Sequence, residues 1–139
     1  MREDIKSLIR SRRHCVLATT KDNLPYCSLM NYAADESCTR IYMATGKKTR
    51  KYRNLVQNPK AGLLIDDRHA SPPLALTLTG TFEQITDPEE IKKLRSHLLQ
   101  NSPDIKAFLD EPDAALICIR VCSVVFLDNL THAYREEIK

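Results

Sequence analysis

The sequence predicts a mostly β protein, an antiparallel β-barrel with helices at its periphery. Short runs of apolar and β-branched residues alternate with turn-forming residues along most of the chain, which is typical of strands joined by hairpins. The strand–helix–strand alternation of a parallel sheet is missing. Because short antiparallel strands expose their edges unless the sheet closes, a barrel fits this pattern best. With 139 residues, we expect one domain over residues 1–139.

The first third of the chain predicts a short helix followed by a meander. The helix is expected over residues 3–12, and the strands over residues 14–20, 25–33 and 39–45. Ile5, Leu8 and Ile9 recur at helical spacing among charged residues, so this helix should lie on the outside of the barrel. The turn-forming residues Lys21–Asn23 separate the first two strands, which predicts a hairpin.

The middle of the chain predicts a second helix and two further strands. The helix should begin at Thr49, which is a good N-cap, and end at Asn58–Pro59. A strand is expected over residues 61–66, then a loop. The run over residues 74–85 alternates in polarity, with leucines on one face, and predicts a half-buried strand.

The last third predicts two helices and two strands. Asp87 is an N-cap candidate followed by proline, so a helix should follow with apolar residues facing inward. These inward residues are Ile91, Leu94 and Leu98. A second short helix should begin at Ser102. Strands are expected over residues 114–121 and 123–128, with a polar tail from Asn129, which gives about seven strands in all.

Cysteine usage and charge narrow the class of protein. The five cysteines show no CxxC pair and no histidine at zinc spacing, so we expect reduced thiols that pack as small hydrophobes and no metal site. The charged N-terminal residues lack the apolar stretch of a secretory segment, which predicts a cytoplasmic protein without a membrane partner. A formal net charge of +3 argues against a nucleic-acid partner.

One segment concentrates positive charge at the start of the second predicted helix. Its cations are Lys47, Lys48, Arg50, Lys51 and Arg53. The unpaired N–H groups and the dipole at a helix N-terminus favour an anion and disfavour cations. The hydroxyls of Thr45 and Thr49, together with the cations Lys48, Arg50 and Lys51, predict a phosphate site, since arginine grips two oxygens and lysine supplies a point charge. The alternative is a solvated cationic helix start.

Three stretches of the sequence carry a resemblance to a known family. They are HCVLATTKDNLPYCSLMNYA, IYMATGKKTRKYRNLVQNPKAGLLID and VVFLDNLTHAYRE. The Thr49–Lys51 triplet, followed by a helix, Asn-Pro and an apolar strand, is the most specific part. On these residues the chain resembles the FMN-binding split β-barrel proteins related to pyridoxamine 5′-phosphate oxidase. The resemblance implies a split β-barrel that binds FMN as a homodimer, with the flavin at the subunit interface.

The resemblance also implies which residues hold the cofactor. The second strand would lie along the isoalloxazine ring, largely through backbone contacts of Ser28, Leu29, Met30 and Asn31. The ribityl phosphate would be held by Thr45, Thr49, Arg50 and Lys51, with Lys48 assisting. Ser28 stands where the family would place an arginine. A true pyridoxamine phosphate oxidase is longer and ends in a segment with Trp and Arg, whereas this sequence has no Trp, so a small member without that activity is expected.

Several functions stay open from the sequence. The first is a flavin oxidoreductase that passes electrons from a reduced donor to a small acceptor, in which no catalytic side chain is assigned because the flavin does the chemistry. The second is a non-catalytic FMN-binding or electron-carrier protein, and deazaflavin or haem in the same cleft is a further alternative. His97 is expected on a helix surface. Whether His69 or His132 reaches the cofactor is left open.

Overall fold

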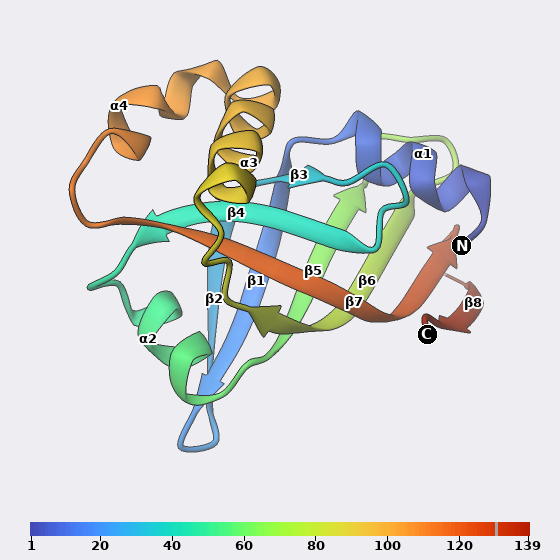
Figure 1. Cartoon of the computed structure of the whole chain (residues 1–139). Helices are drawn as coiled ribbons and strands as arrows, with labels where there is room; N and C mark the ends of the chain where they lie inside the picture. Colours follow the sequence, from blue (N-terminus) through green and yellow to red (C-terminus); the bar gives the residue numbers. More distant parts are fainter. Residues whose placement is uncertain (130) are drawn as a thin grey trace.

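The computed structural model describes residues 1–129 and 131–139, and within them a strongly curled antiparallel sheet carries four α-helices around it (Figure 1). The elements are α1 (Glu3–Ser11), β1 (His14–Lys21), β2 (Leu24–Asn31), β3 (Ala33–Ala34), β4 (Arg40–Gly46), α2 (Arg50–Gln57), β5 (Lys60–Asp67), β6 (Leu74–Glu83), α3 (Pro88–Asn101), a 3₁₀ turn (Pro103–Ile105), α4 (Lys106–Leu109), β7 (Ala114–Asp128) and β8 (His132–Glu137). The mostly β fold class predicted from the sequence is confirmed.

The sheet runs in the order β2–β1–β5–β6–β7–β4–β3, and β8 pairs with β7 outside this path. All of these pairings are antiparallel. The curl brings β2 close to β4, although the two strands are not paired. The sheet is therefore a barrel split between these strands, and β2 keeps one edge free of strand partners within the described residues.

The hydrophobic core fills the inside of the curl. Leu17, Ile65 and Leu78 come from three adjacent strands and are almost fully buried. Helix α1 adds Ile5 and Ile9 to the same core, as its helical spacing predicts. The outer face of α1 is polar, so burial of this apolar stripe fixes the helix against the barrel.

Strand β7 is continuous where the sequence predicts two strands. Thr79 pairs with Ser123 and Gly80 pairs with Val121, so Cys122 is an extra residue in the ladder between β6 and β7. Such a β-bulge absorbs one residue and bends the strand without ending it. The strands also approach closely here, because a Cβ atom added to Gly80 would lie 2.4 Å from the carbonyl oxygen of Arg120.

The polar tail predicted from Asn129 is wrong, because residues His132–Glu137 form β8 against the end of β7. The N-terminal segment stabilises this strand. The Arg2 guanidinium lies 4.5 Å from the centre of the Tyr134 ring, and the Met1 ammonium lies 3.1 Å from the Glu136 carboxylate. Polar edge strands of this kind lack the apolar alternation that signals a strand in the sequence.

Three of the five free cysteines are buried, as expected for small hydrophobes. Burial raises the pKa of both Cys15 and Cys118 to about 12, so these thiols stay protonated near neutral pH and are poor nucleophiles. Cys27 is exposed and Cys122 is half-buried at the bulge.

Helix α3 is attached to the barrel by a polar contact that the sequence analysis missed. His97, expected on the surface, is half-buried, and its Nε2 donates a hydrogen bond of 2.7 Å to the carbonyl oxygen of Ala34 in β3. Leu94 and Leu98 are buried as predicted, whereas Ile91 is only half-buried. Across the described ranges, no helix has the length and apolar character needed to cross a membrane.

Candidate functional site

The candidate anion site lies at the connection between the end of β4 and the start of α2. Thr49 caps the helix, since its Oγ1 accepts a hydrogen bond of 3.4 Å from the Tyr52 N–H. The same hydroxyl donates to the carbonyl oxygen of Gly46 at 2.8 Å. Because a hydroxyl carries one proton, Thr45 must be the donor in the 3.0 Å bond between the two threonine hydroxyls. Both predicted threonines therefore shape the helix start, and their protons are already engaged.

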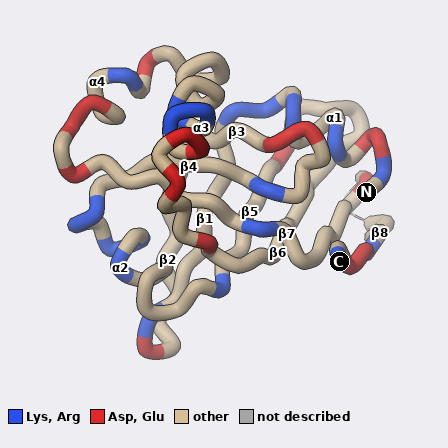
Figure 2. Tube along the Cα trace, viewed as in Figure 1, with Lys and Arg blue, Asp and Glu red and all other residues tan. Residues whose placement is uncertain are grey.

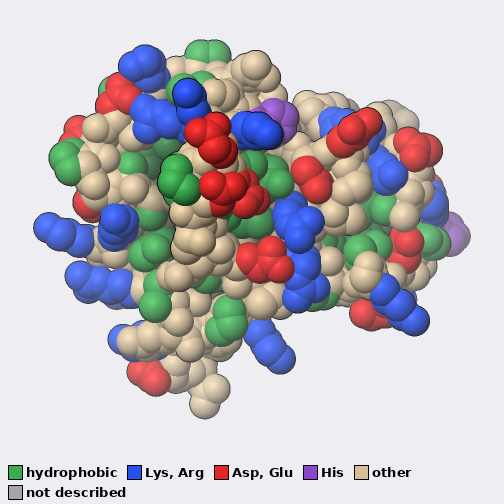
Figure 3. Space-filling model, viewed as in Figure 1, with side chains coloured by type: hydrophobic (Ala, Val, Ile, Leu, Met, Phe, Trp, Pro, Cys, Tyr) green, Lys and Arg blue, Asp and Glu red, His purple; other side chains and the backbone are tan. Residues whose placement is uncertain are grey.

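The cations around this helix start have no acidic partners among the residues that the structure describes. Helix α2 has no acidic residue in its first turn. None of the ion pairs formed between described residues involves the following cations: Lys47, Lys48, Arg50, Lys51 and Arg53. Figure 2 shows the basic positions gathered along α2, and Figure 3 shows cationic side chains projecting on that side. Positive charge at a helix N-terminus is unfavourable without an anion.

The same helix start lies beside β2, which joins the two halves of the predicted site. The Arg50 guanidinium lies 4.9 Å from the centre of the Tyr26 ring, at cation–π distance. Tyr26 precedes Ser28 by two residues on β2, so both side chains leave the same face of the strand. The residues of α2 that are predicted to bind phosphate therefore lie next to β2, the strand predicted to lie along the flavin ring.

A buried hydrogen bond fixes α2 to the barrel. Asn54 is 2% exposed and donates from Nδ2 to Oγ1 of Thr19 in β1, at 3.1 Å. This pair was not predicted from the sequence. A polar residue on the apolar face of α2, between Lys51 and Leu55, was the only signal of it. Asn54 and Arg50 are four residues apart, so they share the helix face that looks toward β1 and β2.

The four predicted residues of β2 do not share one surface. Leu29 is 75% exposed, whereas Met30 is buried in the core. Ser28 precedes both in sequence, and its Oγ is buried without a hydrogen-bond partner among the described residues. Asn31 is half-buried at the strand end. What the four residues share is the unpaired edge of β2, whose alternate backbone groups are free to bind a ligand.

The residues present fit a phosphate-bearing planar cofactor. Lys48, Arg50 and Lys51 supply charge at a helix N-terminus, which is the usual environment of a bound phosphate. The orphaned Ser28 Oγ and the free edge of β2 supply polar groups for a ring. A buried hydroxyl without a partner costs about 1–3 kcal/mol, so a ligand that bonded it would remove an existing penalty.

A groove opens at the other end of β2, over the outside of the sheet. Its volume is about 320 Å³, and its lining combines cations with apolar side chains. Its lining includes Arg12, Arg13, His14, Leu29, Leu64, Asp66 and Arg68. His14 is exposed here, and His69 and His132 are exposed elsewhere on the surface.

The outside of the sheet carries an apolar row that crosses three strands. Val16 pairs with Leu29 on one side and with Leu64 on the other. Register partners in a sheet point to the same face, so the three side chains form one continuous row. Leu29 and Leu64 are 75% and 40% exposed, and the next row along these strands holds only small side chains at Ala18 and Gly62. This apolar row is accessible, and it borders the charged side chains of Arg12, Arg13, Asp66 and Arg68 that line the groove.

Comparison with known proteins identifies relatives of most of the chain. The profile of a family described as pyridoxamine 5′-phosphate oxidase matches residues 1–127. No curated protein matches the sequence.

Solved structures similar to this chain share its fold at low sequence identity. A haem-binding protein from Mycobacterium smegmatis has a TM-score of 0.82 and 19% identity over 95% of this chain and 56% of its own. ChuZ from Campylobacter jejuni has a TM-score of 0.83 and 15% identity, over 97% of this chain and 58% of its own. A putative pyridoxamine 5′-phosphate oxidase from Listeria innocua has a TM-score of 0.74 and 18% identity, over 90% and 96%.

Proposed function

Because the chain belongs to the pyridoxamine 5′-phosphate oxidase family, we propose that it is a flavoprotein that binds FMN at the start of α2. The observation that carries this proposal is the set of cations around the α2 N-terminus, which have no acidic partners within the described residues. The adjacent edge of β2 lies within reach, because Arg50 contacts Tyr26 of that strand. Phosphate and ring would thus be held by neighbouring elements.

Bound FMN would supply a ring that accepts and donates electrons, and the protein contributes binding and orientation. Lys48, Arg50 and Lys51 would neutralise the phosphate. Thr49 holds the helix N-terminus in the conformation that directs its N–H groups outward. Ser28 Oγ, which lacks a partner, is the side-chain group that β2 offers to the ring.

The phosphate claim is tested by comparing FMN with riboflavin, which lacks the phosphate. A charge-assisted hydrogen bond contributes roughly 1.5–3 kcal/mol, so Arg50→Ala or Lys51→Ala should weaken FMN binding about tenfold to a hundredfold. Riboflavin should bind weakly and be indifferent to either change. Arg53→Ala, which removes an exposed cation from the same helix, is the matched control. Equal losses for both ligands, measured by fluorescence quenching, would refute the phosphate site.

We propose that the flavoprotein is an oxidoreductase that passes electrons from a reduced small-molecule donor to a small acceptor. The support is the family membership together with a ring-side strand that no described element covers on its free edge. Anaerobic mixing of the FMN-loaded protein with NADH or NADPH is the direct test. Bleaching of the flavin band within seconds supports a nicotinamide-dependent oxidoreductase. Absence of bleaching with both donors favours the non-catalytic carrier instead.

We further propose that the protein is a homodimer that packs through the apolar row of Val16, Leu29 and Leu64. Exposed leucines that form a continuous apolar row on a sheet face are typical of a protein–protein interface. Such a dimer would bring the partner's surface next to β2 and its free edge. Leu29→Lys should convert the dimer to a monomer in light scattering, whereas Val56→Lys, on the exposed side of α2, should not. A monomeric parent protein at micromolar concentration would reject the dimer.

Haem is a second candidate ligand, favoured by the groove that contains His14. A histidine is a common axial ligand of haem iron. Arg13, which forms no ion pair with a described residue, could pair with a haem carboxylate, whereas Arg12 and Arg68 are already paired with Asp67 and Asp66. A similar fold occurs in a haem-binding protein from Mycobacterium smegmatis. Haemin titration distinguishes the two candidates. A Soret shift lost in His14→Ala would support haem in the groove, whereas binding unaffected by this change would exclude that site.

A further inference from the structure

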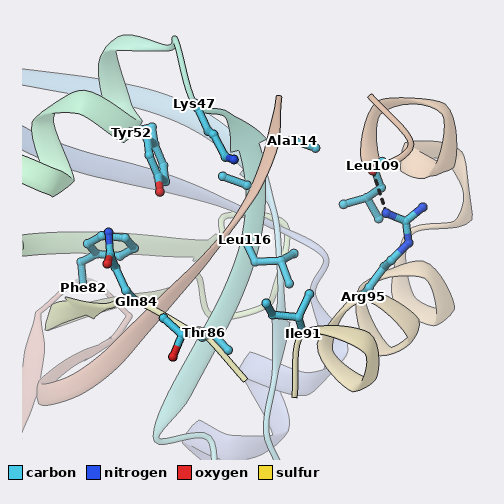
Figure 4. A pocket seen from close by; sticks show the side chains of 12 residues that line it. Lys47, Tyr52, Phe82, Gln84, Thr86, Ile91, Arg95, Leu109, Ala114 and Leu116 are labelled. Atoms are coloured by element: carbon cyan, nitrogen blue, oxygen red, sulfur yellow. Dashed lines mark hydrogen bonds between the residues drawn. The ribbon is translucent and has the colours of Figure 1, made fainter. Parts of the chain in front are cut away.

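A cavity of about 340 Å³ lies between α2, the end of β6, the start of β7 and helix α3. Figure 4 shows Tyr52 and Phe82 on one side of this α2–α3 cavity, and Leu116 and Ile91 facing them. Lys47 enters from the edge near Tyr52, with its ammonium directed toward the space between Tyr52 and Leu116. Small-molecule sites are usually concave and mostly apolar, with a few polar groups that fix orientation.

The cavity is separate from the FMN site proposed above. Arg50 contacts Tyr26 of β2 and Asn54 bonds to β1, so that face of α2 looks toward the first hairpin. Tyr52 points the other way, with its ring centre 6.1 Å from that of Phe82 in β6. Residues two apart on a helix lie about 200° apart around its axis. The two surfaces therefore lie on opposite sides of α2.

The walls of the cavity favour a planar apolar group. The rings of Tyr52 and Phe82 meet edge to face at 76°, which leaves aromatic surface available for a third ring. Leu116 and Ile91 supply the opposite wall, and both are only half-buried. A volume near the lower end of the usual range for ligand pockets suits one or two fused rings rather than a nucleotide.

The polar groups of the cavity favour a single negative charge. Lys47 forms no ion pair with any residue that the structure describes. The other cation in the lining, Arg95, is already committed to the carbonyl oxygen of Leu109 at 2.7 Å and to Asp110. One available ammonium group matches the single charge of a carboxylate, whereas a phosphate dianion would need more than one cation.

We propose that the α2–α3 cavity binds a small aromatic carboxylate, with its ring between Tyr52 and Leu116 and its carboxylate on Lys47. This site is independent of FMN binding and would exist whether or not the flavin proposal holds. Gln84 and Thr86 at the far edge, whose side chains make no hydrogen bond with described residues, are available to polar substituents on the ring.

The proposal is tested with 2-naphthoate and its neutral analogue 2-naphthalenemethanol. The chain contains no Trp, so naphthalene fluorescence can be followed directly on the full-length protein. Loss of a charge-assisted contact should weaken 2-naphthoate binding about tenfold to a hundredfold in Lys47→Met. The neutral analogue should bind parent and variant alike. Lys48→Met, the adjacent cation that does not line the cavity, is the matched control and should leave 2-naphthoate affinity unchanged.

Three results would overturn the site. The first is 2-naphthoate affinity that is the same in Lys47→Met as in the parent protein. The second is an equal loss in Lys47→Met and Lys48→Met, which would indicate diffuse attraction to the basic helix. The third is competitive displacement of 2-naphthoate by FMN, which would place both ligands in one site. Circular dichroism of each variant verifies that the fold is kept.

Discussion

Gly80 is the position at which the fold should be least tolerant of a single added methyl group. A Cβ atom at this position would lie 2.4 Å from the carbonyl oxygen of Arg120 and 2.7 Å from Cγ2 of Ile119. Ordinary contacts between such atoms are about 3.5–4.0 Å, so β6 and β7 would have to separate by about 1 Å at the bulge. The main obstacle is backbone, which cannot rotate away.

The expected cost of Gly80→Ala follows from these distances. Overpacking of a tight core costs typically about 1–3 kcal/mol, and the reduced entropy of the unfolded chain returns about 0.4–1 kcal/mol. We expect Gly80→Ala to lower the free energy of unfolding by about 2 kcal/mol. This value is near the upper end of the difference between these two contributions, because the close contact is with backbone. Urea denaturation followed by far-UV circular dichroism measures it.

Gly62 offers a matched control in the same sheet. A Cβ atom at Gly62 would lie 3.8 Å from Cβ of Ala18 and 4.0 Å from the carbonyl oxygen of Leu78, which are ordinary contacts. Gly62→Ala should therefore be neutral or stabilising by about 0.4–1 kcal/mol. The two variants should be compared at the same oligomeric state. If both alanines changed stability equally, the close approach of β6 and β7 at Gly80 would be refuted.

Three further predictions concern α2, its contact with β2, and the buried thiols. Asn54→Ala should lower the free energy of unfolding by about 1–3 kcal/mol, because it leaves the buried Thr19 hydroxyl in β1 without its hydrogen-bond donor. An unchanged urea midpoint would contradict this. Tyr26→Ala should weaken FMN binding about twofold to fivefold, because Arg50 loses the ring that holds it and an exposed cation–π contact contributes roughly 0.5–1 kcal/mol. Tyr26→Phe keeps the ring and should bind FMN like the parent protein in the same titration. Burial raises the pKa of Cys15 from 9.0 to about 12, so between these pH values the unfolded chain loses a proton that the folded protein keeps. Stability is therefore intact below pH 9 and should fall as the pH rises toward 12, by about 1.4 kcal/mol per pH unit for such a group; Cys15→Ala should make this fall shallower in alkaline urea titrations, and the exposed Cys27→Ala should not.

Much of the fold could be predicted because its signals are local. The stripe of Ile5 and Ile9, the Thr49 cap and the alternation in β6 each depend on neighbours in sequence, and each appears in the structure. β8 was missed because its residues are mostly polar, and the contacts that support it beyond its ladder with β7 come from Arg2 and Met1, at the opposite end of the chain. Long-range contacts of this kind leave no periodic pattern in a single sequence.

The candidate site likewise has one part that the sequence predicts and another that depends on long-range contacts. The charge on Arg50 and Lys51 is visible in the sequence, because cations at a helix start stand out from their setting. The partners that place this charge are not visible: Tyr26 approaches Arg50 from β2, 24 residues earlier, and Asn54 bonds to a strand 35 residues away. The sequence therefore indicates which kind of ligand the site could bind. The packing of α2 against β1 and β2 determines which other residues lie next to that ligand.

The unpaired edge of β2 exposes the chain to uncontrolled strand addition. An open strand edge is a template on which other chains can add, and this leads to aggregation unless the edge is blunted. Pro25, paired with Thr20 near the start of β2, has no N–H to donate and so interrupts such an added ladder. Beyond it, no described element covers the edge, so the protein without the proposed flavin should be the more prone to aggregate.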